Sequence, residues 1–223
     1  MAKKEGKIIK ILKKVGAILT GDHFVYTSGR HGSVYINKDF LYLYPPEVAK
    51  VGRMFAEKFK DQNIEVVTAP AVGGTILASW TAFYLSKLTK KEVLAVYTEK
   101  DKGTTASAQE SNQIFRRGYD QFVCGKRVLV LEDLTTTGGS VKKTVECVRR
   151  TGGKVIAVCV MVNRDPKNVT TQTVGAPFSA LGIFEAVSYS AEFCPLCRKN
   201  IPINTTIGHG KQYDISKKIR KNC

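Results

Sequence analysis

Two adjacent carboxylates, Glu132 and Asp133, directly follow a short apolar run and precede a turn rich in threonine and glycine. The run at 128–131 is apolar and bounded by polar residues, as expected of a buried parallel strand. Beyond the turn at 135–140, valines recur at helical spacing, which predicts a helix that begins near Gly139. The N-terminus of such a helix presents backbone N–H groups and the positive end of its dipole, which suits a phosphate. The sequence therefore predicts an anion-binding loop beside an acidic pair.

The acidic pair indicates what else this loop binds. Carboxylates do not bind phosphate directly, but they can bind sugar hydroxyls or a Mg²⁺ ion next to it. Gly138 and Gly139 allow the backbone to approach an anion closely. The combination predicts a site for a phosphorylated ribose, and the alternative is an ordinary strand–turn–helix with a solvated acidic pair. Neither nucleotide-binding motif, G-x-x-x-x-G-K-[ST] or G-x-G-x-x-G, occurs in the chain.

The stretch 127–151 resembles the signature of type I phosphoribosyltransferases, which bind 5-phosphoribosyl 1-diphosphate (PRPP). The resemblance implies an α/β fold with a mostly parallel sheet flanked by helices, and a small hood from the N- and C-terminal segments. It also implies Mg²⁺, bound through PRPP with Glu132 and Asp133 nearby. It assigns PRPP binding to Glu132, Asp133, Thr135, Thr136, Thr137, Gly138, Gly139, Ser140, Ala71, Gly73, Gly74 and Lys100.

The segment 20–37 reads as two short strands around a turn at 28–30, and its part 26–37 carries a second resemblance. It is similar to the N-terminal segment of orotate phosphoribosyltransferases, where an aromatic residue precedes an S-G-[RK] turn and a Tyr-x-Asn strand follows. In that family the segment helps to cover the pyrimidine, which gives Tyr35 an orotate-binding role. Many members carry a lysine where this chain has Thr27. By itself the segment would be a hairpin with a basic tip.

A small-residue turn, 69–74, follows the predicted strand 65–68 and precedes a predicted helix. In the family this turn binds the diphosphate, and some relatives have a lysine where Gly73 stands. An ordinary strand-to-helix turn is the alternative. Arg164 follows the predicted strand 155–162, so it faces the ligand side of an open α/β sheet. The resemblance assigns orotate binding to Thr136, Arg164 and Tyr35.

The polar, aperiodic segment 98–113 is long for a connection between two core strands. Such a segment is often a mobile lid, although a surface loop with incidental lysines is the alternative. In the orotate family the loop closes over PRPP, commonly from the partner subunit of a dimer. The resemblance assigns catalytic roles to Lys100, Lys102 and Asp133. Many members begin the loop with Arg-Lys and carry a later histidine, and this chain has neither.

Composition narrows the function classes. The chain has 223 residues and a formal net charge of +16, which favours anionic partners such as phosphorylated substrates or, as the alternative, nucleic acid. No apolar run approaches the roughly 18 residues that span a bilayer. The apolar positions of 4–19 alternate with lysines at helical spacing, which predicts an amphipathic helix packed on the domain rather than a signal peptide. A membrane-surface helix is the alternative. We expect a cytoplasmic protein with no membrane partner.

The six cysteines do not indicate a disulfide framework, because the chain has no secretory signal pattern. Cys147 and Cys159 lie in apolar segments, where buried thiols are expected. Cys194 and Cys197 form a C-P-L-C motif that offers two zinc ligands, while a structural zinc site needs four. The remaining candidates for the other two ligands are His209 and Cys223, and their spacing is uninformative. The motif also resembles the C-terminus of a bacterial branch of orotate phosphoribosyltransferases.

Taken together, the resemblance implies orotate phosphoribosyltransferase activity in pyrimidine biosynthesis, with Mg²⁺ and a homodimer that shares the loop. The alternatives are a phosphoribosyltransferase for a purine base and a PRPP-sensing regulator that binds nucleic acid. The expected organisation is a hood segment 1–44, a PRPP-binding core 45–169 with a mobile loop at 99–116, and a second hood segment 170–223.

Overall fold

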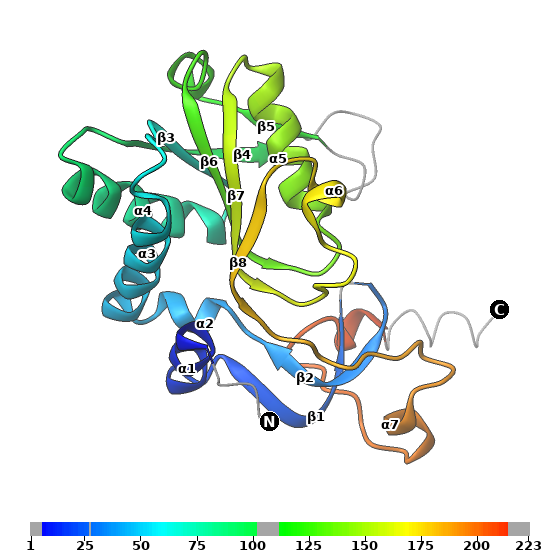
Figure 1. The fold of residues 1–223 in the computed structure, drawn as a ribbon. Coiled ribbons are helices and arrows are strands. Elements are labelled where there is room, and N and C mark those ends of the chain that lie inside the picture. The colour runs from blue at the N-terminus through cyan, green and yellow to red at the C-terminus, as the bar shows by residue number, and fades with distance from the viewer. Residues whose placement is uncertain (1–5, 27, 102–111, 214–223) are drawn as a thin grey trace. The chain divides into compact units, whose positions relative to one another are not determined.

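The computed structural model describes residues 6–26, 28–101 and 112–213 (Figure 1). The chain divides into two compact units. The larger comprises Met1–Ile11 and Lys38–Glu185, and the smaller comprises Leu12–Asn37 and Ala186–Cys223. The smaller unit is thus built from both ends of the chain, over narrower segments than the two hood segments expected from the sequence.

The larger unit contains a six-stranded sheet in the order β5-β4-β3-β6-β7-β8. Five strands are parallel and β5, at one edge, is antiparallel to β4. This confirms the predicted mostly parallel α/β sheet, although the short strand β5 was not predicted. The strands are β3 (Val66–Pro70), β4 (Leu94–Lys100), β5 (Gln113–Phe115), β6 (Arg127–Thr135), β7 (Lys154–Asn163) and β8 (Phe178–Ile183).

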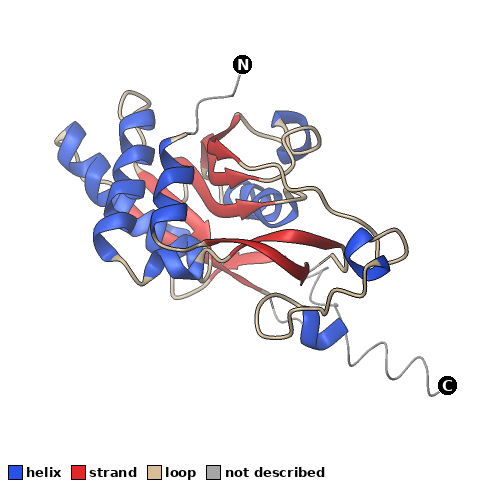
Figure 2. Cartoon of the chain, turned by 90° about the horizontal axis from the view of Figure 1, so that it is seen from below, coloured by secondary structure: helices blue, strands red, loops and turns tan. Residues whose placement is uncertain are grey.

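Helices cover both faces of this sheet, as Figures 1 and 2 show, with α3 and α4 on one face and α5 on the other. Between residues 38 and 185 the structure describes the helices and 3₁₀ turn α2 (Asp39–Tyr42), α3 (Pro45–Phe59), α4 (Gly73–Thr89), η1 (Tyr119–Phe122), α5 (Gly139–Arg150) and α6 (Thr171–Val174). Proline at the first position of α3 is preorganised for a helix start. Valines from β3, β6, β7 and α5 form a continuous buried cluster. Because β6 is covered on both faces, its apolar run shows no alternation.

The first helix is shorter than expected. It was predicted over 4–19, but α1 spans Lys7–Lys14 and strand β1 begins at Ile18. Gly16 adopts a positive φ of 69°. The N–H of Gly16 donates to the carbonyl of Lys13, and the N–H of Ala17 donates to that of Leu12, which is the Schellman pattern that ends a helix. The apolar side of α1 is buried, and no helix among the described residues is both long and apolar enough to cross a membrane.

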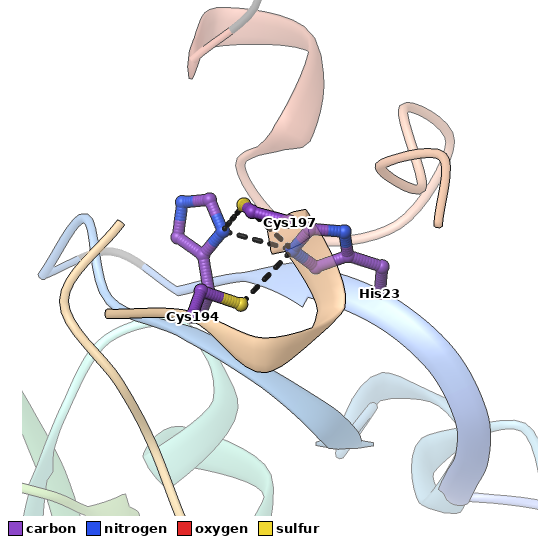
Figure 3. Close-up of side chains that lie close together, drawn as sticks. His23, Cys194 and Cys197 are labelled. Atoms are coloured by element: carbon purple, nitrogen blue, oxygen red, sulfur yellow. Dashed lines mark hydrogen bonds between the residues drawn. The ribbon is translucent and has the colours of Figure 1, made fainter. Parts of the chain in front are cut away.

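The smaller unit is organised by an antiparallel hairpin of β1 (Ile18–Val25) and β2 (His31–Ile36), as predicted. The C-terminal segment pairs with this hairpin through bridges between His23 and Ile203 and between His31 and Tyr189. A short helix, α7 (Pro195–Arg198), lies between those two bridges in sequence. It places Cys194 and Cys197 beside His23, as Figure 3 shows.

Candidate functional site

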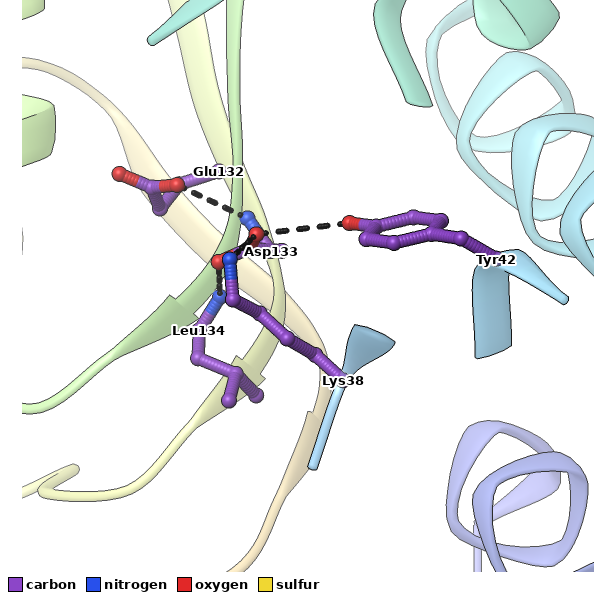
Figure 4. A network of polar contacts seen from close by, with 5 residues as sticks. All are labelled: Lys38, Tyr42, Glu132, Asp133 and Leu134. Atoms are coloured by element: carbon purple, nitrogen blue, oxygen red, sulfur yellow. Dashed lines mark hydrogen bonds and ion pairs between the residues drawn. The ribbon is translucent and has the colours of Figure 1, made fainter. Parts of the chain in front are cut away.

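The acidic pair lies near the carboxyl end of β6 and is almost fully buried, with Glu132 7% and Asp133 5% exposed. The carboxylate Oε1 of Glu132 accepts a hydrogen bond of 3.1 Å from the N–H of Asp133. The N–H of Leu134 donates to Oδ1 of Asp133 at 2.6 Å. The backbone therefore holds both carboxylates in defined positions (Figure 4).

Two residues that the sequence analysis missed complete this cluster. Nζ of Lys38 lies 2.5 Å from Oδ2 of Asp133, and the hydroxyl of Tyr42 donates to the same oxygen at 3.4 Å (Figure 4). Lys38 stands directly after the Tyr-x-Asn strand and Tyr42 ends α2. The only sequence signal was a lysine just past a strand end, because nothing in the spacing pairs it with a carboxylate 95 residues away.

Electrostatics in this cluster reflect burial and close charges. Burial and then the neighbouring charge of Asp133 raise the pKa of Glu132 well above its usual 4.5, although hydrogen bonds from the Asp133 backbone and the Ser140 side chain oppose this. Burial disfavours the charged form of Lys38, but the charge of Asp133 and its hydrogen bond outweigh burial and raise the pKa of Lys38. Burial and both acidic charges raise the pKa of Tyr42, so its hydroxyl stays protonated. The site thus holds a charged ammonium beside two crowded carboxyl groups.

The predicted phosphate loop connects β6 to α5. Gly138 has a φ of 75°, a conformation that glycine adopts without strain, and it forms the N-cap of α5. The N–H of Gly138 donates to Oγ1 of Thr135 at 3.0 Å, and the N–H of Gly139 donates to Oγ1 of Thr137 at 3.4 Å. The threonine hydroxyls therefore order the loop from within. Four of its residues are exposed: Thr136, Thr137, Gly139 and Ser140.

The predicted diphosphate turn lies directly beside the acidic pair. A Cβ at Gly73 would overlap Oδ2 of Asp133 and would lie only 2.9 Å from Nζ of Lys38 and the hydroxyl of Tyr42. The N–H of Ala71 donates to the carbonyl of Thr98 at 2.8 Å, which fixes the start of the turn on the neighbouring strand. The turn can approach the carboxylates only because position 73 has no side chain. Gly74 packs just as closely, since a Cβ there would lie 2.6 Å from that of Ala69.

Arg164 lies one residue beyond β7 and next to the phosphate loop. Its N–H donates to the carbonyl of Thr135 at 2.9 Å, which continues the pairing of β6 and β7. The residue is partly exposed. The structure therefore brings Arg164 and Thr136, two of the three predicted orotate contacts, to the same edge of the sheet.

The third, Tyr35, belongs to the smaller unit, where its ring lies 5.5 Å from that of Phe24 and 6.4 Å from that of Tyr26. Its role toward orotate stays a prediction. Lys100 is exposed at the end of β4. This strand pairs with β3, the strand that leads into the diphosphate turn. Lys102 lies outside the described residues, as do Thr27, Cys223 and most of the predicted loop.

The base of that loop is held by ion pairs that the sequence did not indicate. Arg116 lies 3.6 Å from Asp101, and Arg117 lies 3.3 Å from Glu99. These contacts fasten the end of β4 to the segment that follows β5. The catalytic roles predicted for Lys100 and Lys102 remain predictions.

The donor set of the acidic pair fits a Mg²⁺ ion. Glu132 and Asp133 offer carboxylate oxygens, the ligand type that Mg²⁺ prefers, and one of these oxygens already accepts the ammonium of Lys38. Mg²⁺ usually takes one or two protein carboxylates and completes its shell with water and substrate phosphate. The expectation that Mg²⁺ binds through PRPP, with Glu132 and Asp133 nearby, stays a prediction.

Comparisons with known proteins agree with this geometry. Residues 40–173, more than half of the chain, match the phosphoribosyl transferase domain family. The orotate phosphoribosyltransferase of Caldanaerobacter subterraneus is 36% identical over 197 residues, which cover 88% of this chain and 94% of that protein. The orotate phosphoribosyltransferase of Thermotoga maritima is 35% identical over 196 residues, which cover 87% and 94%.

Among solved structures, that of orotate phosphoribosyltransferase from Aeropyrum pernix superposes with a TM-score of 0.60 at 25% identity. The match covers 79% of this chain and 93% of that structure. The predicted fold and the resemblance to phosphoribosyltransferases are thereby confirmed.

Proposed function

Since the chain belongs to the phosphoribosyltransferase family, we propose that it is an orotate phosphoribosyltransferase. The reaction would convert orotate and PRPP to orotidine 5′-phosphate and diphosphate. The observation that carries the proposal is the buried pair Glu132 and Asp133 beside an exposed threonine- and glycine-rich loop, with Arg164 hydrogen-bonded to the base of that loop.

In this proposal the acidic pair holds the ribose hydroxyls of PRPP, and the loop 135–140 holds its 5′-phosphate. The N-terminus of α5 adds its dipole to the loop, which favours the phosphate charge. The anomeric carbon develops positive charge as the bond to diphosphate breaks. The carboxylates nearby stabilise that charge, so catalysis needs no covalent nucleophile and depends on positioning and electrostatics.

Lys38 and Tyr42 position Asp133 in this mechanism. Their contacts hold one carboxylate oxygen in place and keep the charge of Asp133 partly neutralised. The diphosphate leaves along the turn at 71–74, where Gly73 allows the backbone to lie close to the carboxylates. Bound Mg²⁺ supplies positive charge that stabilises the departing diphosphate.

Arg164 selects the base. Orotate carries a carboxylate, and the planar guanidinium of arginine pairs with carboxylates through two parallel hydrogen bonds. Thr136, on the exposed loop beside Arg164, adds a second contact. We also propose that Tyr35 covers the base, and that the segment around Lys100 and Lys102 closes over PRPP, within a homodimer that shares this loop.

The test is loss of orotate absorbance when the full-length protein is mixed with PRPP, Mg²⁺ and orotate, with Asp133→Asn in parallel. Asp61→Asn is the matched control, because Asp61 is exposed in the turn after α3. Activity in the wild type and in the control, but not in Asp133→Asn, supports the proposal. PRPP binding by calorimetry without orotate consumption would overturn the orotate assignment. Consumption of a purine base, or salt-dependent binding of RNA, would then identify which alternative holds.

A further inference from the structure

Four side chains that can bind a metal converge inside the smaller unit. They are His23 on β1, His31 on β2, and Cys194 and Cys197 at α7. His23, His31 and Cys194 are fully buried, and Cys197 is partly buried. Figure 3 shows the sulfur atoms of Cys194 and Cys197 directed toward the ring of His23.

The distances in this cluster approach those of tetrahedral coordination. The four ligand atoms all lie within 4.8 Å of one another. Sγ of Cys194 lies 3.6 Å from Nε2 of His23, and Sγ of Cys197 lies 3.4 Å from Nδ1 of His31. Zinc–nitrogen and zinc–sulfur bonds of normal length at tetrahedral angles place nitrogen and sulfur about 3.5 Å apart. A zinc ion at the centre therefore requires little movement of the two thiols.

The imidazole of His23 is oriented to act as a ligand. Nδ1 of His23 lies 2.8 Å from the carbonyl oxygen of Ile201, which can only accept, so Nδ1 carries the proton. Nε2 of His23 is then the nitrogen with a lone pair, and it faces the cluster. This arrangement, in which the second ring nitrogen donates to a backbone carbonyl, is the one that orients metal-binding histidines.

The surroundings of the cluster give it a structural role. The described residues of the smaller unit include the β1–β2 hairpin, the short helix α7 and connecting segments, and the unit joins two stretches that are far apart in sequence. Units of this size bury little apolar surface and are commonly stabilised by a metal or by disulfides. The cluster lies where the hairpin meets the C-terminal segment, because the N–H of Asn204 donates to the carbonyl of His23 and His31 pairs with Tyr189.

From these observations we propose that His23, His31, Cys194 and Cys197 bind one zinc ion. Two imidazoles and two thiolates in a tetrahedral arrangement are a ligand set that zinc prefers, and four protein ligands leave no open position for catalysis. The ion would fasten the β1–β2 hairpin to α7. This inference does not depend on the proposed function, because none of the four residues belongs to the PRPP site.

The rival explanation is a hydrogen-bonded cluster without metal. Nε2 of His23 and Nδ1 of His31 are 2.8 Å apart, a hydrogen-bond distance, and zinc binding would separate them by about 0.5 Å. In that explanation the thiols of Cys194 and Cys197 hydrogen-bond to the same two imidazole nitrogens, at 3.6 and 3.4 Å, so the two explanations differ in whether a metal is bound. A second rival is a disulfide between Cys194 and Cys197.

The first experiment measures zinc by mass spectrometry in the full-length protein purified without added metal. We expect about one zinc per chain. The double variant Cys194→Ser/Cys197→Ser should lose it, whereas Cys124→Ser, which removes an exposed thiol of the larger unit, should retain it. Equal zinc content in both variants would overturn the assignment of ligands.

The second experiment uses the wild-type protein alone, so it remains decisive if the double variant does not fold. Protein stripped of metal with a chelator under reducing conditions is titrated with Co²⁺. Intense visible absorption of tetrahedral cobalt with thiolate ligands, saturating at one equivalent and displaced by Zn²⁺, supports the site. No stoichiometric binding of either ion would overturn the proposal and leave the hydrogen-bonded cluster. A mass two hydrogens below that of the reduced protein, with no bound metal, would overturn it in favour of the disulfide.

Discussion

The molecule contains two buried polar clusters that differ in what surrounds them. Glu132 and Asp133 lie near the carboxyl end of the central strand β6, with Lys38 beside them, and the sheet packs against a large apolar cluster. His23, His31, Cys194 and Cys197 lie in a unit with few elements, and they are part of its interior. Burial of polar groups is costly in both places, because water is removed from them.

The two clusters contribute differently to stability and to activity. In the larger unit the apolar core stabilises the fold, so the acidic cluster can hold an arrangement that serves chemistry at the expense of stability. In the smaller unit the polar cluster adds to a set of buried apolar side chains that includes Phe24, Val25 and Ile36, and it stabilises the unit provided that a metal binds its ligands. Changes in the first cluster should therefore affect activity more than folding, and changes in the second should affect folding first.

Removing the metal should produce the largest change in stability, and it should affect the smaller unit but not the larger one. A site that holds zinc at a thousandfold excess of free ion over the dissociation constant adds about 4 kcal/mol of stability. Chelation should therefore increase hydrogen exchange in β1, β2 and α7, while β6 and β7 remain protected. Peptide-level hydrogen exchange with and without chelator measures this directly. Equal loss of protection in both units would show that they do not differ in the way described.

A matched change in the larger unit is Leu129→Ala, at a fully buried position of β6. Truncation of a buried leucine leaves a cavity and should cost about 3 kcal/mol. The effect should appear as a lower midpoint in denaturant-induced unfolding followed by a probe in the larger unit, with zinc content unchanged. If the variant released zinc under native conditions, the two units would be coupled more strongly than their separate interiors suggest.

The fold was predictable from sequence wherever one local signal was sufficient. The apolar run of β6 and the glycine turn before α5 both gave the correct element. The end of α1 was missed because the decisive signal, Gly16 in a left-handed conformation, lies inside an otherwise periodic apolar pattern. Strand β5 was missed because it has only three residues and pairs with β4 across a polar segment.

The site residues were also predictable only where they are neighbours in the sequence. The acidic pair and the phosphate loop are contiguous in sequence, so their chemistry could be inferred from local order. Lys38 and Tyr42 reach Asp133 only through the tertiary fold, and no spacing rule links them. His23 and His31 of the proposed zinc site likewise reach the two cysteines only through the tertiary fold. His209 was a remaining candidate at uninformative spacing, but it contacts Gln212, and the topology brings His23 and His31 to the cysteines instead.

Arg164→Ala tests the proposed contact between Arg164 and the orotate carboxylate. Loss of a charge-assisted contact to the orotate carboxylate should cost about 2 kcal/mol, or about a 30-fold rise in the KM for orotate, with a much smaller change in the KM for PRPP. Unfolding should change little, because Arg164 is partly exposed. Arg53→Ala, which removes an exposed ion pair with Glu57, is the control and should leave both constants unchanged. Equal rises for the two substrates would refute a carboxylate-binding role.

Glu132→Gln gives the smallest effect and the most direct test that the acidic cluster lowers stability. Burial and the charge of Asp133 raise the folded-state pKa of Glu132 above its usual 4.5, so the folded protein favours the protonated carboxyl. Its stabilising contribution is complete below 4.5 and is lost as pH rises through the folded-state pKa. Glutamine does not titrate and can still accept the hydrogen bond from the N–H of Asp133. The variant should therefore be more stable than the wild type by about 1 kcal/mol at pH 8, with the difference shrinking toward pH 5, while losing activity. Thermal unfolding of both proteins at the two pH values measures this, and a difference independent of pH would mean that the buried charge of Glu132 does not destabilise the fold.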